Sequence, residues 1–90
     1  MTDTIKDTLK KWKLLKTKEE YEFYHKIRPM TMLQKTALLG QEFMDEYVKI
    51  QTFNNEQEFI EHLSQIENYK LRIALGDTYL TIVNQQQIFF

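Results

Sequence analysis

Two helix-start signals, placed on either side of the single proline, constrain the first half of this chain most strongly. Both match the capping box, in which a hydroxyl and a side-chain oxygen three residues later satisfy free backbone N–H groups at a helix N-terminus. The two matches are Thr17-Lys-Glu-Glu20 and Thr31-Met-Leu-Gln34. Pro29 disfavours helical geometry in the residue that precedes it. We therefore predict one helix over about 18–27 and a second that starts near residue 32.

Apolar residues at helical spacing define the other predicted helices. The spacing predicts helices over about 4–16, 32–51 and 56–67, and Asn54-Asn55 supplies the break before the last of them. Their apolar positions are Ile5, Leu9, Trp12 and Leu15 in the first, Met32, Leu33, Ala37, Leu39, Phe43, Met44, Tyr47, Val48 and Ile50 in the second, and Phe59, Leu63 and Ile66 in the third. Gly40 falls within the apolar arc of the longest helix, so we expect its missing side chain to let another helix approach closely.

After Asn68 the apolar period changes from 3.6 to 2, the period of a half-buried strand. The alternation predicts strands over about 69–75 and 78–83, joined by a two-residue turn at Gly76-Asp77. A third strand over 87–90 would complete a meander. The expected fold class is therefore α+β: about four helices followed by a small C-terminal antiparallel β-hairpin or three-stranded meander, in a single domain over residues 1–90.

Composition narrows the class of protein. The chain has no cysteine, so we expect neither disulfides nor thiolate metal sites, as in a reducing cytosol. No apolar run approaches the ~20 residues of a membrane span, and the first residues lack the apolar run of a signal peptide. We expect a cytoplasmic protein.

Lysine outnumbers arginine ten to two, which is typical of an AT-rich bacterial genome or of a phage or mobile element that lives in one.

The residues that catalysis or metal binding requires are scarce. Ser64 is the only serine, and no base or orienting group lies in a recognisable pattern around it. Glu22 and His25 form one Glu-x-x-His element, whereas a carboxylate-bridged di-iron bundle requires two. Glu58 precedes His62 by four residues, but His62 lies on the flank of its predicted helix. The two glycines are 36 positions apart, which excludes a glycine-rich phosphate loop. We therefore expect no enzyme activity, no metal and no cofactor.

Charge is balanced overall but unevenly distributed along the chain. Residues 5–18 hold six lysines and one aspartate, whereas residues 41–68 hold seven acidic residues and one lysine. Such asymmetry can steer the approach of a partner. It can equally be satisfied within the fold, or between two copies of the chain, in which case the basic helix of one copy meets the acidic face of another.

The acidic half leads to a first function hypothesis. We expect a small non-catalytic regulator or inhibitor that docks an acidic surface on a basic surface of a larger protein. The candidate partner-binding residues are Leu38, Glu42, Asp45, Glu46, Glu58 and Glu61. The other interpretation of these residues is a solvated face that confers solubility, with Lys49 paired to Asp45 at i, i+4. The partner's identity does not follow from the pattern, and a homodimer fits it as well.

A winged-helix DNA-binding protein acting as a transcriptional regulator is the alternative function, because helices followed by a β-hairpin have its order of elements. The candidate nucleic-acid-binding residues are Lys6, Lys10, Lys13, Lys70 and Arg72. The helix before the expected wing opposes this interpretation: residues 56–67 hold four glutamates and no lysine or arginine, and phosphate contacts supply much of the affinity for DNA. The basic first helix also resembles an interfacial membrane anchor, although core packing explains its four apolar residues better.

Overall fold

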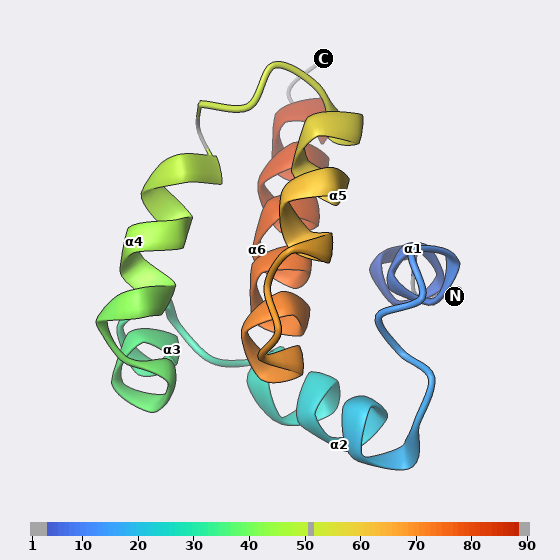
Figure 1. Cartoon of the computed structure of the whole chain (residues 1–90), viewed down its shortest axis with the longest axis vertical. Helices are drawn as coiled ribbons and strands as arrows, with labels where there is room; N and C mark the ends of the chain where they lie inside the picture. Colours follow the sequence, from blue (N-terminus) through green and yellow to red (C-terminus); the bar gives the residue numbers. More distant parts are fainter. Residues whose placement is uncertain (1–3, 51, 89–90) are drawn as a thin grey trace.

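The computed structural model of the chain describes residues 4–50 and 52–88, with side chains as far as residue 83. These residues form six α-helices and contain no strand (Figure 1). The helices are α1 (Thr4–Lys11), α2 (Lys18–Ile27), α3 (Met32–Leu39), α4 (Gln41–Ile50), α5 (Glu56–Ser64) and α6 (Tyr69–Ile88). The predicted α+β class is therefore wrong for the described part of the chain, which is all-helical.

Helix α6 occupies the centre of the molecule. Figure 1 shows α4 on one side of it, α1 on the other, α5 running alongside and α2 across one end. Helices α1, α2, α3 and α4 all contact α6, and α5 meets it where the rings of Phe59 and Tyr79 stack with centroids 4.1 Å apart. Between residues 71 and 80, only Arg72 and Tyr79 are not fully buried. Residues 73–78, in the middle of the last helix, are thus covered on every side.

This central position explains why the predicted hairpin is wrong. A helix that is apolar all round is a buried helix, and in α6 the buried positions include both members of the alternating pattern, such as Ile73 and Ala74. Gly76 lies within the helix rather than in a turn, and a Cβ atom there would come within 2.8 Å of Leu9 Cδ2. Of the third predicted strand, residues 87 and 88 belong to α6, and residues 89 and 90 lie outside the described residues.

The long helix predicted over 32–51 is interrupted at Gly40. This residue has φ +88° and ψ −175°, a conformation that residues with a Cβ rarely adopt, and its N–H donates to the Thr36 carbonyl at 2.7 Å to close α3. The expected close approach of a helix at Gly40 is wrong, since an added Cβ would meet nothing within 4 Å. Residue 51, the predicted end, lies outside the described residues.

The local start signals are confirmed. Both capping boxes form, at Thr17 and at Thr31, and α2 has the predicted bounds. Asn55 caps α5, with its side chain accepting from the Glu58 N–H at 2.9 Å. Helix α5 ends at Ser64, three residues before the predicted end. Local hydrogen bonds therefore fix where these helices begin, as the sequence pattern indicates.

Helix α1 ends earlier than predicted, at Lys11 rather than residue 16. The chain leaves it through a Schellman motif, in which Leu14 N–H donates to the Leu9 carbonyl and Lys13 N–H to the Lys10 carbonyl, both at 2.9 Å. Lys13 takes a left-handed conformation, with φ +64°. The reversal carries Leu14 and Leu15 into the core, so the predicted apolar stripe is buried through a loop as well as a helix.

Outside α6, the core holds five apolar side chains with no exposed surface: Leu9, Tyr24, Ile27, Phe43 and Phe59. They come from four different helices, α1, α2, α4 and α5, and they surround α6. Within the described residues, every helix is too short or too polar to cross a bilayer.

Candidate functional site

The large apolar side chains left exposed in the described part of the chain all lie on α3 and α4. They are Leu33 at 81%, Val48 at 59% and Leu38 at 43% exposure. Exposed apolar residues scattered singly are ordinary on a protein surface, but here all three lie on two consecutive helices. Two of the three were predicted to be core residues, and the break at Gly40, which turns α4 away from the axis of α3, explains why they are not.

Acidic side chains accompany these residues. Glu42 and Asp45 are exposed on α4, and the spacing of three residues from Glu42 to Asp45 to Val48 puts them on one side of the helix. We call Leu33, Leu38, Glu42, Asp45 and Val48 the α3–α4 face. Figure 1 shows these two helices at one edge of the molecule, on the opposite side of α6 from α1. The face is therefore apolar and acidic, and no other described helix covers it.

The six predicted partner-binding residues divide into two groups. Leu38, Glu42, Asp45 and Glu61 are exposed, and the last two each accept from a glutamine one turn earlier, Gln41 and Gln57. Glu46 and Glu58 have structural uses instead. Glu58 accepts from the Asn54 backbone N–H at 2.9 Å and so helps to cap α5. The expected pair of Lys49 with Asp45 is wrong, because Lys49 contacts Glu46 at 3.1 Å.

Glu46 joins α4 to α5. Its carboxylate is hydrogen-bonded to His62 Nε2 and also accepts from Lys49 Nζ at 3.1 Å. Burial alone would raise the pKa of Glu46, but the hydrogen bonds and charges of His62 and Lys49 outweigh it and hold the pKa below the usual value. Glu46 is thus a structural tie between two helices rather than part of an open acidic surface.

The predicted nucleic-acid-binding residues lie on α1, on the loop that follows it and on α6. Lys6 lies over the Tyr21 ring at 5.5 Å from its centroid, and Lys70 lies over the Phe23 ring at 5.9 Å. Arg72 donates to the Ile66 carbonyl at 3.0 Å. The other two, Lys10 and Lys13, are exposed. The expected wing is wrong, since residues 69–83 belong to α6, and the winged-helix interpretation loses its basis.

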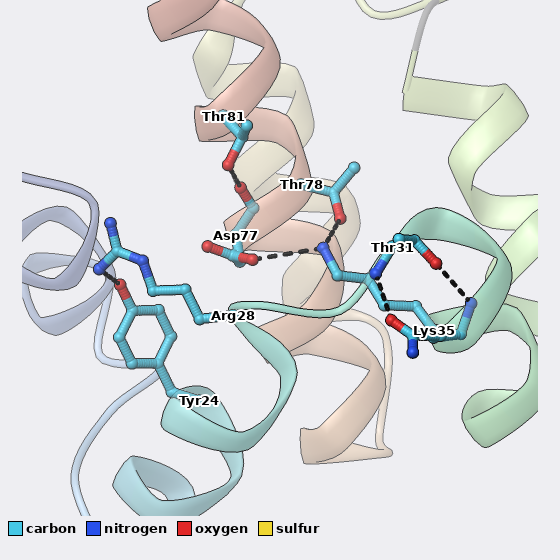
Figure 2. Close-up of polar contacts among 8 residues, drawn as sticks. Tyr24, Arg28, Thr31, Lys35, Asp77, Thr78 and Thr81 are labelled. Atoms are coloured by element: carbon cyan, nitrogen blue, oxygen red, sulfur yellow. Dashed lines mark hydrogen bonds and ion pairs between the residues drawn. The ribbon is translucent and has the colours of Figure 1, made fainter.

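A buried ion pair, which the sequence pattern did not predict, lies where α2, α3 and α6 meet (Figure 2). The Lys35 side chain of α3 is directed at α6, where its Nζ lies 3.4 Å from Asp77 Oδ2 and 3.2 Å from Thr78 Oγ1. Lys35 has only 6% of its surface exposed. One signal was present: Lys35 follows Met32 by three residues and precedes Leu39 by four, which puts it on the inward side of its helix.

The ion pair borders a pocket of about 290 Å³. Its polar side is formed by Arg28, Lys35, Asp77 and the hydroxyls of two threonines, Thr78 and Thr81. Its apolar side includes Met30 and Ile82. Arg28, at the C-terminal end of α2, donates to the Tyr24 hydroxyl at 2.6 Å and lies over the same ring. Burying a charge is costly unless it is paired, so the buried charges of Lys35 and Asp77 depend on their pairing.

The residues considered for catalysis or metal binding belong neither to the α3–α4 face nor to the wall of this pocket. Ser64 is exposed and its hydroxyl donates to the Glu61 carbonyl at 2.6 Å. Glu22 and His25 are exposed on α2. Across residues 4–50 and 52–88, no three histidine or acidic side chains converge as metal ligands would.

Comparisons with known proteins found no match. No protein-family model matches the chain, and neither the curated proteins nor the solved structures contain a matching one.

Proposed function

We propose that this chain is a non-catalytic protein-binding regulator or inhibitor, which docks its α3–α4 face on a basic, partly apolar surface of a larger protein. One observation carries the proposal: the three large apolar side chains that remain exposed in the described residues share two adjacent helices with two exposed acids. The free energy of docking would come from burying the apolar groups, at about 25 cal/mol per Å² of apolar surface.

The charges of α3 and α4 support a basic partner. Lys35 is buried and paired, and Lys49 is bonded to Glu46, so the two lysines of these helices offset little of the exposed negative charge. Glu42 and Asp45 are exposed. Charged groups at the edge of an interface mainly raise the association rate and select the partner, rather than supply affinity. Glu42 and Asp45 would therefore mainly raise the association rate, whereas Leu33, Leu38 and Val48 would supply most of the affinity.

The test begins with a purified partner. The tagged protein captures partners from lysate of a low-GC bacterium after nuclease treatment, and a protein retained at near-stoichiometric yield is purified and titrated by calorimetry. We expect Leu33→Ser/Val48→Ser to weaken binding at least tenfold. We expect Glu42→Lys/Asp45→Lys to lower the association rate, with a larger effect at low salt. Both double variants change exposed positions and should leave the melting temperature nearly unchanged.

The matched control is Glu19→Lys/Glu22→Lys on α2, which makes the same change of net charge at two other exposed acids. The control should bind as the unchanged protein does. If Glu42→Lys/Asp45→Lys and the control weaken binding equally, the change of net charge explains the effect, and the position of the acids does not. Unchanged binding by Leu33→Ser/Val48→Ser would rule out the α3–α4 face, and loss of binding on Lys10→Glu/Lys11→Glu would assign docking to α1 instead.

A further inference from the structure

The pocket at the Lys35–Asp77 pair has two hydrogen-bond donors that no described residue uses. A lysine ammonium carries three N–H donors, and Lys35 directs hydrogen bonds to Asp77 Oδ2 and Thr78 Oγ1. The Thr78 hydroxyl accepts that bond, and within the described residues nothing accepts its own proton. Both groups are buried and both line the pocket. Because an unused buried donor is costly, the pocket favours a ligand that brings acceptors.

The charges around the pocket favour an anion. Two cationic side chains, Arg28 and Lys35, line it with a single carboxylate, that of Asp77. Figure 2 shows Arg28 and Lys35 on opposite sides of Asp77, with Lys35 directed at its carboxylate and Arg28 at the Tyr24 hydroxyl. An anionic ligand would therefore meet more positive than negative side chains at the pocket wall.

The remaining wall is apolar and adaptable. Met30, Met32, Tyr47 and Ile82 complete the pocket, and methionine side chains adjust to differently shaped apolar groups because they are unbranched. The volume of about 290 Å³ is at the small end of known ligand pockets. It suits a molecule of about the size of an amino acid.

We propose that this pocket binds a small monocarboxylate that carries a compact apolar group. The carboxylate would accept from Lys35 Nζ and the Thr78 hydroxyl near Arg28, and the apolar group would lie against Met30 and Ile82. The proposal is independent of the α3–α4 face: it concerns the inward side of α3, whereas docking uses the outward side. Its failure would leave the proposed function untouched.

The test uses hexanoate and phenylacetate as probes of the whole protein, with hexanol, hexylamine and inorganic phosphate as matched alternatives. Binding is followed by ¹H–¹⁵N NMR titration and by the melting temperature, which rises when a ligand binds only the folded state. We expect saturable binding of a carboxylate probe, at least tenfold tighter than hexanol, with shifts in α3 and α6. Hexylamine and phosphate should not bind. Equal affinity for hexanol and hexanoate would overturn carboxylate recognition, as would tighter binding of phosphate.

Variants separate the polar groups from the apolar wall. Thr78→Val keeps the side-chain shape, and we expect it to weaken hexanoate binding several-fold without unfolding the protein. Ile82→Trp fills the pocket and should abolish binding, whereas Ile60→Trp, outside this pocket, should not. The variant Lys35→Met/Asp77→Asn removes both charges, which avoids leaving one charge buried alone. Undiminished hexanoate affinity in this double variant, or no saturable binding of either carboxylate to the unchanged protein, would refute the proposal.

Discussion

At the scale of single residues, the Lys35–Asp77 pair carries the largest energetic consequence. Both side chains are buried, at 6% and 2% exposure, so each depends on the other for compensation of its charge. Breaking a buried pair by removing one partner typically costs about 3–5 kcal/mol, whereas replacing both charges costs far less.

We expect Lys35→Met to lower the free energy of unfolding by about 3–5 kcal/mol, because Asp77 keeps its buried charge and loses that cation. Methionine and lysine have similar helix propensities, so the loss is not a helix effect. Lys35→Met/Asp77→Asn should recover much of the stability in urea denaturation. If the double variant is as unstable as the single one, the pair does not act as a pair.

Lys13 is the described residue other than glycine that has a positive φ, and it stands where helices most often place glycine. A left-handed conformation costs a residue with a Cβ about 1–2 kcal/mol relative to glycine. We expect Lys13→Gly to raise the free energy of unfolding by about 0.5–1 kcal/mol. Lys10→Gly, inside α1, is the control and should lower it by about 1 kcal/mol. A loss of stability in Lys13→Gly would argue against the Schellman motif.

At the scale of helices, the two glycines exchange the roles that the sequence pattern suggests. Gly40 was expected to allow close packing, and it ends α3 with φ +88°. Gly76 was expected to make a turn, and it lies in α6 where Leu9 packs closely. Sequence periodicity shows that a glycine lies in an apolar context, but it does not show whether the backbone bends there, because that depends on which helix is available to pack.

The two glycines should respond differently to alanine. Gly40→Ala puts a Cβ on a conformation reserved for glycine, so we expect it to lower the free energy of unfolding by about 1–3 kcal/mol. Gly76→Ala gains about 1 kcal/mol of helix propensity and loses a similar amount as Leu9 Cδ2 and Leu14 Cδ1 are displaced, so its net effect should be small. Thermal and urea denaturation measure both. A stabilising Gly40→Ala would indicate one continuous helix.

The tie between α4 and α5 gives a pH dependence. Because hydrogen bonds from His62 and Lys49 lower the pKa of Glu46 in the folded protein, the stability they add is complete above the unfolded pKa, near 4.5, and is lost as the pH falls through the folded pKa. We expect Glu46→Gln to be less stable than the unchanged protein at pH 7, with the difference shrinking below about pH 4.5. A difference that stays constant down to pH 3 would show that the charge of Glu46 contributes nothing.

Helix starts could be predicted because they depend on a few neighbouring residues. Thr17, Thr31 and Asn55 each satisfy backbone N–H groups within one turn, and the structure confirms all three. The nature of α6 could not be predicted in this way. Its apolar residues read as period 2 because residues 73–78 are buried on every side, and that burial depends on the other helices packing around α6.

At the scale of the whole molecule, the packing that buries the apolar residues of α6 leaves some apolar residues of α3 and α4 exposed. Five helices surround α6 and bury its apolar residues, yet α3 and α4 keep Leu33, Leu38 and Val48 exposed. Sequence analysis identified Leu38, Glu42 and Asp45 as surface residues from helical periodicity. It could not identify Leu33 and Val48, because the arc it assumed runs through an unbroken helix, whereas the chain bends at Gly40.

The proposed docking surface is tested most directly by hydrogen exchange on the purified complex, compared with the free protein by mass spectrometry. Amide exchange reports which segments a partner covers or stabilises. The proposal predicts that slowing on binding is concentrated in residues 32–50, the segment that holds the α3–α4 face, with little change over residues 4–16. Slowing confined to residues 4–16, with 32–50 unchanged, would contradict it and assign the interaction to the basic helix α1.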